Sequence, residues 1–185
     1  EKQDCEQKAF VRLAGKIKKH FPRMPLCILA DGLYPNNTVF RTCRRNGWGF
    51  IITLKDGCLK TFQTEVCLLQ NTAKKRDVFR RNNTHNIHLE YSYINDIEYD
   101  GYNYNWASCR EIKTRHSDKQ ITEQVFVYIT NIKQTDQSVI CTADGGRLRW
   151  KIENESFNTQ KNQGYELEHK YSRVSYTALQ NYYQL

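Results

Sequence analysis

The sequence predicts an α/β fold whose core contains a parallel βαβ unit and is interrupted by a strand-rich insertion. Three observations support this: two short apolar runs flank a helix-like segment, a long stretch of β-formers follows, and helical composition then returns. The 185 residues therefore divide into a first part of the core at 1–58, a β-rich insertion at 59–143 and a helical return of the core at 144–185. We expect the last part to continue beyond residue 185.

The chain opens with a predicted helix over residues 4–19. Its apolar residues recur at helical spacing, and lysines near its end suit the negative end of the helix dipole. Its apolar stripe comprises Ala9, Phe10, Leu13, Ala14 and Ile17. Prolines at 22 and 25 then break the helix.

The βαβ unit is predicted over residues 26–54. Apolar runs at 26–30 and 50–54 indicate two buried strands, and the segment between them carries Val39, Phe40 and Cys43 on one helical face. Residues 36–38 supply an N-cap, and Gly47 ends the helix. Because the two strands are joined by a helix, we expect them to be parallel with a right-handed crossover.

The insertion is predicted to be rich in strands and poor in helices. Strands are indicated at 88–93, 102–109 and 124–132, separated by polar turns. Residues 144–146 indicate a turn, followed by helices at 147–160 and from 172 onward.

Composition narrows the class of protein. The chain has 28 Lys and Arg against 20 Asp and Glu, and its net charge of +8 favours a polyanionic partner. No apolar run approaches the ~20 residues of a membrane helix, so we expect no membrane association through one. Its seven cysteines are odd in number and form no Cys-x-x-Cys pair, which favours free structural thiols in a reducing compartment.

Two carboxylates stand out as candidate site residues. Asp31 follows the first apolar strand directly, at the sheet edge where α/β proteins place functional groups and where a carboxylate can bind a divalent cation. Glu153 lies four residues after Arg149, on the same face of a predicted helix. Each also has a simpler interpretation, because Asp31 can merely begin a turn and Glu153 can form an ordinary surface ion pair.

Two segments together resemble DDE-type bacterial insertion-sequence transposases. Residues 29–36 read LADGLYPN, similar to the motif around that family's second aspartate. Residues 146–153 read GRLRWKIE and continue as NESFNTQKN, similar to the helix that carries the third carboxylate. The β-rich stretch between them matches an insertion found in one branch of the family, so the resemblance covers essentially the whole chain.

The resemblance implies an RNase-H-like core that cleaves DNA strands and transfers them by metal-assisted phosphoryl transfer. Asp31 and Glu153 would be catalytic metal ligands in a site for two Mg²⁺ about 3.5–4 Å apart, with Mn²⁺ as an alternative metal. The partners would be transposon ends and target DNA, bound by a homodimer in the bacterial cytoplasm at the nucleoid. The implied DNA-contacting residues are Arg149, Lys161, Arg147, Tyr34 and Trp106.

The sequence departs from the family pattern at three positions. The first aspartate has no counterpart in an upstream strand, since Asp4 lies at a polar helix start, so we expect it before residue 1 and expect residues 1–185 alone to be inactive. Gly146 stands where the family often has Tyr, and Gln160 stands where a Lys is expected, one residue before Lys161.

Alternatives remain open at this stage. The basic residues can form either a phosphate-binding surface or a set of solvated charges, and Trp106 can pack in the core instead of stacking on a base. The rival function is a non-catalytic DNA-binding remnant or domesticated derivative of a transposase. A weaker third possibility is an RNase-H-like nuclease that cleaves without strand transfer.

Overall fold

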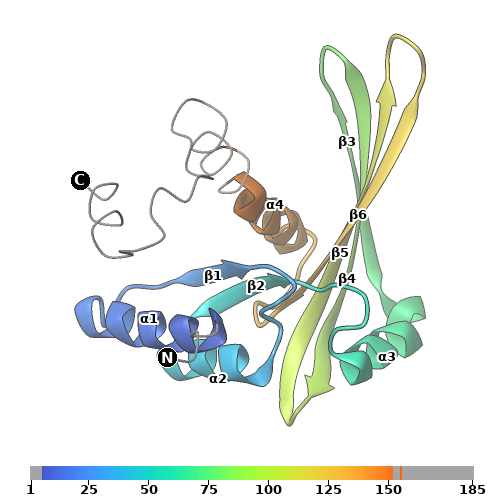
Figure 1. Ribbon diagram of the computed structural model, residues 1–185. Helices are drawn as coiled ribbons and strands as arrows, with labels where there is room; N and C mark the ends of the chain where they lie inside the picture. Colours follow the sequence, from blue (N-terminus) through green and yellow to red (C-terminus); the bar gives the residue numbers. More distant parts are fainter. Residues whose placement is uncertain (1–5, 152–154, 156–185) are drawn as a thin grey trace, which may run out of the picture. The chain divides into compact units, whose positions relative to one another are not determined.

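A computed structural model describes residues 6–151 and residue 155 of the chain. These residues form a mixed α/β structure with one six-stranded sheet (Figure 1), which confirms the predicted fold class at this level. The chain divides into two compact units, Glu1–Arg147 and Leu148–Leu185, and the whole sheet belongs to the first. In order, the elements are α1 (Glu6–His20), β1 (Cys27–Ala30), α2 (Asn37–Asn46), β2 (Gly49–Thr53), α3 (Lys60–Leu69), a 3₁₀ turn (Gln70–Thr72), β3 (Lys74–Arg81), β4 (His85–Tyr99), β5 (Tyr102–Arg115), β6 (Ile121–Thr130) and α4 (Ser138–Lys151).

The predicted βαβ unit is confirmed. Strands β1 and β2 pair in parallel from Cys27 opposite Gly49, with α2 between them in the chain. The Asn36 side chain accepts a hydrogen bond from the backbone N–H of Val39, as an N-cap does, and Gly47 closes the helix with a left-handed φ of 69°.

Strand β1 is not buried, contrary to the prediction from its apolar run. It is the edge strand of the sheet and pairs with β2 alone among the described strands. Its first residue, Cys27, is exposed, and the next three are half-buried. An apolar run predicts burial on both faces of a strand, but it does not predict whether a second neighbour covers its edge.

The strands of the insertion continue the sheet of the βαβ unit. The strand order is β1-β2-β6-β5-β4-β3, and β6 pairs antiparallel with β2 across the predicted boundary at residue 58. Strands β3 to β6 form a long twisted antiparallel ribbon (Figure 1). A bulge between Ile94 and Ile97 bends β4, where Asp96 has a φ of 60° and donates its backbone N–H to the Asn105 side chain.

The structure contains an α-helix and a strand that the sequence did not indicate. Helix α3 buries only Phe62 and Val66 and has no side-chain cap, so it lacks both the wide apolar stripe and the capping signal. Strand β3 is an edge strand in which Val78 alone is half-buried and the other residues are exposed. Its run of basic residues hides the alternation that identifies a strand.

Helix α4 corrects the predicted turn at residues 144–146. The helix begins at Ser138 and passes through Asp144, Gly145 and Gly146 without a break. The two glycines lie against the sheet, where an added Cβ at residue 146 would be 2.3 Å from a ring carbon of Tyr128. Because glycine has no side chain, the helix can approach the sheet closely at these two positions. Glycine also has a low helix propensity, so the sequence of this segment resembled a turn.

Two apolar clusters lie on opposite faces of the sheet. Phe40, Phe50, Ile52 and Trp106 belong to the cluster beneath α1, α2 and α3, which also takes in Ala14 of α1. Tyr91, Tyr128 and Val139 belong to the cluster beneath α4. The helices therefore cover both faces of the sheet (Figure 1).

Candidate functional site

Asp31 lies where the sequence placed it, immediately after β1. The residue is half-buried, and its Oδ1 accepts a hydrogen bond of 3.0 Å from the backbone N–H of Leu33. Its carbonyl accepts another from Tyr34 N. In the described part of the chain, no cationic side chain lies within 4.0 Å of its carboxylate. Asp31 therefore forms the turn of the simpler interpretation, and its carboxylate has no cationic partner among the described residues.

The loop after β2 packs against this turn. A Cβ at residue 32 would lie 2.4 Å from Lys55 Cγ, so Gly32 leaves room for the Lys55 stem to cross it. The Cys58 thiol lies 3.6 Å from the Gly32 carbonyl oxygen, and Gln63 donates to the carbonyls of Lys55 and Cys58. The ends of β1 and β2 thus form one fixed edge of the sheet, with Asp31 on it.

Helix α4 packs on β1 and β2 through Gly145. An added Cβ at Gly145 would lie 3.4 Å from Ile51 Cδ1 and 4.0 Å from Leu29 Cδ2, and Leu29 is two residues before Asp31. Glu153 and Lys161 lie outside the described residues. Arg149 is in α4 but belongs to the second compact unit. The assignments of these three residues stay predictions.

Arg147 makes a bidentate contact with a buried carboxylate. Its Nη1 and Nη2 donate to the two oxygens of Glu111 at 3.0 and 3.3 Å, and its guanidinium lies 4.8 Å from the Phe126 ring centre. Lys113 Nζ is 2.8 Å from Glu111, whose side chain is 5% exposed. Arg147 thus joins α4 to β5, and its predicted DNA contact would have to share the guanidinium with Glu111.

The Glu111 cluster should make stability depend on pH. Burial alone raises the pKa of Glu111, but hydrogen bonds from Lys113 and Arg147, with their charges, outweigh it and lower the pKa below its ordinary value. This group therefore stabilises the fold above its ordinary pKa of about 4.3, and the contribution is lost as pH falls through the folded-state pKa.

We expect Glu111→Gln to reduce the free energy of unfolding by about 1–2 kcal/mol at pH 7, since charged hydrogen bonds are lost. Denaturant unfolding between pH 7 and pH 3 should show the gap between wild type and variant narrowing as the wild-type carboxyl protonates. A gap that is constant over this range would show that the Glu111 charge does not stabilise the fold.

The two aromatic residues predicted to contact DNA occupy different environments. Tyr34 is half-buried, with its ring 6.1 Å from that of Phe10 in an edge-to-face arrangement. Trp106 is 7% exposed and belongs to the apolar cluster beneath α1, α2 and α3. Its burial agrees with the packing alternative, so base stacking by Trp106 would require it to leave the core.

The buried thiols are poor nucleophiles. Burial raises the pKa of Cys43 to about 11, and it does the same for Cys109. The free thiols of the described residues include both, which agrees with their predicted structural role.

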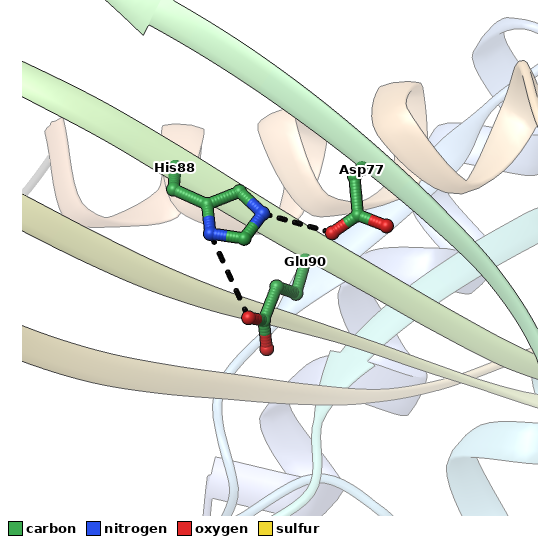
Figure 2. A group of neighbouring side chains, drawn as sticks. All are labelled: Asp77, His88 and Glu90. Atoms are coloured by element: carbon green, nitrogen blue, oxygen red, sulfur yellow. Dashed lines mark hydrogen bonds and ion pairs between the residues drawn. The ribbon is translucent and has the colours of Figure 1, made fainter.

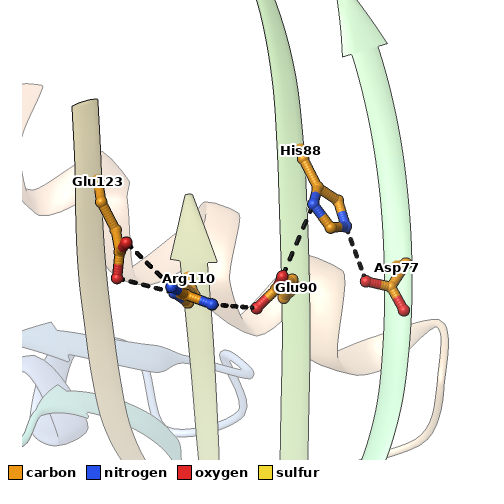
Figure 3. A network of polar contacts seen from close by, with 5 residues as sticks. All are labelled: Asp77, His88, Glu90, Arg110 and Glu123. Carbon is orange, nitrogen blue, oxygen red and sulfur yellow. Dashed lines mark hydrogen bonds and ion pairs between the residues drawn. The ribbon is translucent and has the colours of Figure 1, made fainter. Parts of the chain in front are cut away.

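A ladder of charged side chains crosses four strands on the face of the ribbon opposite α4. His88 Nε2 lies 2.8 Å from Asp77 Oδ1, and His88 Nδ1 lies 3.6 Å from Glu90 Oε1 (Figure 2). Arg110 continues the ladder, with 3.1 Å to Glu90 and a bidentate contact to Glu123 at 2.8 and 3.0 Å (Figure 3). The hydrogen bonds from Arg110 lower the pKa of the Glu123 carboxyl.

Asp77, His88 and Glu90 have ligand atoms within 4.8 Å of one another and could hold a metal ion. However, the two His88 nitrogens face different carboxylates, and Glu90 is shared with Arg110. The Phe79 ring also stacks on His88 at 4.2 Å. A histidine binds a given metal ion through one ring nitrogen, whereas each His88 nitrogen here faces a different carboxylate. The arrangement is therefore a network of charged pairs across neighbouring strands. This pairing depends on strand register, so the sequence did not predict it.

The comparisons with known proteins leave the family open. The sequence matches no protein-family model, and no curated protein is significantly similar to it. No helix among the described residues is both long and apolar enough to span a membrane.

Proposed function

We propose that the chain is a catalytic portion of a DNA transposase with an RNase-H-like core, which cleaves DNA strands and joins them to a target. One observation carries the proposal: Asp31 directly follows a strand of a parallel βαβ unit, and α4 packs beside that strand, with Gly145 next to Leu29. The carboxyl edge of parallel strands is where α/β proteins place functional groups, and the resemblance to the transposase family assigns Glu153 as the second carboxylate.

The chemistry of Asp31 fits a divalent cation. Its carboxylate is a hard oxygen donor, half-buried at the sheet edge, and the turn at Leu33 fixes its orientation. Together with Glu153 and an aspartate from outside residues 1–185, Asp31 would hold Mg²⁺ or Mn²⁺. When bound, such ions stabilise the charge that develops on the attacking and leaving oxygens of an in-line displacement.

The protein's part in the reaction is to position the phosphodiester. Water attacks the phosphorus, the ester bond to the 3′ oxygen breaks, and the strand ends as a 3′-hydroxyl. That hydroxyl then attacks a phosphodiester of target DNA, forming one ester bond while another breaks. We assign Arg149 to a phosphate near the scissile bond, since a guanidinium can bind two phosphate oxygens at once.

The second candidate is a DNA-binding protein without catalysis, derived from a transposase. One contact favours it: Asp31 Oδ1 already accepts a hydrogen bond within its own turn, as an ordinary turn aspartate would. The third candidate, a nuclease without strand transfer, shares the carboxylates and differs only in its products.

Product analysis separates the three. A protein containing these residues and the third carboxylate is incubated with a labelled DNA duplex, a target plasmid and Mg²⁺. A transposase gives both cleaved ends and ends joined to the plasmid. Cleaved ends alone would indicate the nuclease, and intact DNA at concentrations where binding is complete would indicate the non-catalytic protein.

A further inference from the structure

A groove between α1 and α2 has only cationic side chains among its charged residues. It encloses about 320 Å³ and is lined by Lys18, Lys19, Arg41 and Arg45, with no carboxylate among the lining residues. The groove lies beside the C-terminal halves of both helices, on the sheet face opposite α4. It is therefore separate from the helix that leads to Glu153.

Helix dipoles explain part of this charge. The C-terminal end of each helix carries roughly half a negative charge. The two C-terminal ends together therefore balance the charge of about one of the four cations. Lys18 Nζ donates to the Asn46 carbonyl at 3.0 Å, which is the contact of a C-terminal cation. A second cation, Arg41, is paired with Asp100 at 3.2 Å.

Lys19 and Arg45 are the two cations of the groove that these contacts leave over. Both are exposed, and within the described part of the chain neither has a carboxylate at ion-pair distance. Helix α2, one wall of the groove, is anchored to β5, since Arg44 stacks on the Tyr102 ring at 3.1 Å and donates to Tyr104 Oη at 2.6 Å. Two cations without a carboxylate partner among the described residues therefore stand on a concave surface.

A second groove of opposite charge lies between α3 and the hairpin of β4 and β5. It is lined by Glu65, Asp96, Glu98 and Asp100. Helix α3 supplies Glu65, and the bulge and hairpin of β4 and β5 supply the other three carboxylates. Such a surface repels a polyanion, so a nucleic acid that contacts this part of the molecule is directed toward α1 and α2.

We propose that the groove between α1 and α2 binds the phosphate backbone of double-stranded DNA through Lys19 and Arg45. The inference deepens the proposed function by naming a DNA contact away from the carboxylates. A duplex is the occupant that we favour, because its closely spaced phosphates match paired cations on a concave surface and its binding needs no base contact.

The test is duplex binding in EDTA, where the carboxylate site has no metal. Fluorescence anisotropy of a labelled 30-base-pair duplex is measured from about 50 to 200 mM salt for the 185-residue chain and for Lys19→Gln/Arg45→Gln. Loss of two phosphate contacts should weaken binding about tenfold or more at 50 mM salt and reduce the slope of log K against log salt by roughly 1.8.

The matched control is Lys60→Gln/Lys133→Gln, which removes the same charge near the acidic groove. Lys60 begins α3, whose Glu65 lines that groove, and Lys133 lies 3.8 Å from Asp96. It should change the affinity less than twofold. Equal effects of the two double variants, or no duplex binding by the chain, would overturn the proposal. So would sedimentation showing that Lys19→Gln/Arg45→Gln instead abolishes self-association, since the groove would then contact the acidic side of another copy.

DNA binding by this groove and DNA cleavage at the carboxylates can be tested separately. Groove-dependent binding without any cleavage would leave the DNA contact standing and remove the transposase assignment. Cleavage and joining that are unchanged in Lys19→Gln/Arg45→Gln, with unchanged affinity, would remove the groove and leave the catalytic assignment standing.

Discussion

Asp31→Asn is expected to reduce Mg²⁺-dependent DNA cleavage by about 10³-fold or more. The substitution removes the negative charge but keeps Oδ1, which can still accept the hydrogen bond from Leu33 N–H, so the turn should persist. Metal ions contribute several kcal/mol of transition-state stabilisation, and each 1.36 kcal/mol corresponds to a tenfold change in rate. The measurement is single-turnover cleavage of a labelled duplex by the protein that contains all three carboxylates.

Asp56→Asn is the matched control, because Asp56 is an exposed turn residue beyond β2 at the same sheet edge. It should leave the cleavage rate within about twofold of wild type. Both variants should bind the duplex in EDTA with wild-type affinity. Cleavage by Asp31→Asn at the wild-type rate would show that Asp31 is only a turn residue.

Gly146→Val is expected to destabilise the fold by about 3 kcal/mol or more. An added Cβ would lie 2.3 to 2.9 Å from three ring carbons of Tyr128, which is buried and held between β2 and β5. Overpacking of this kind costs typically about 1–3 kcal/mol and occasionally more, and valine adds two further methyl groups. Thermal unfolding should show a midpoint lower by roughly 6–12 °C.

Gly15→Val in α1 provides the comparison, since a Cβ there meets nothing within 4 Å. Its free energy of unfolding should stay within about 0.5 kcal/mol of wild type, because valine and glycine differ little in helix propensity. If Gly146→Val were equally harmless, α4 could not pack on Tyr128 as closely as the structure has it.

The sequence predicted the βαβ unit because its signals are local. Asn36 and Gly47 cap α2 with their own side chain and backbone, and Val39, Phe40 and Cys43 are buried at the predicted spacing. In α1 the inner side of the stripe is Phe10, Ala14 and Ile17, while Leu13 is 56% exposed. Periodicity identifies a helix more reliably than it identifies which edge of its apolar stripe meets the core.

Features that depend on distant partners were not predictable from local pattern. Whether β1 lies at an edge depends on where β6 inserts, and β6 is about seventy residues later in the chain than β2. Gly145 and Gly146 resemble a turn until Tyr128 and Ile51 are known to lie beneath them. The pairing of Asp77 with His88 follows from strand register, which no single segment encodes.

For the candidate site, sequence reasoning located Asp31 on its strand end, and the structure places it there. It also selected Arg147 as a DNA contact, whereas the structure gives that side chain a buried partner in Glu111 on β5. A basic residue near a motif indicates positive charge, but only the fold reveals which charges remain without a partner.

The convergence of Asp31 and Glu153 on one metal site is tested most directly by Mn²⁺-induced broadening of backbone amide NMR signals in the protein that contains all three carboxylates. We predict that amides around residues 31 and 153 broaden together at the same Mn²⁺ concentration, and that Asp31→Asn suppresses the broadening of both sets. Broadening centred on His88 and Glu90, or broadening near residue 153 that survives Asp31→Asn, would contradict a shared site.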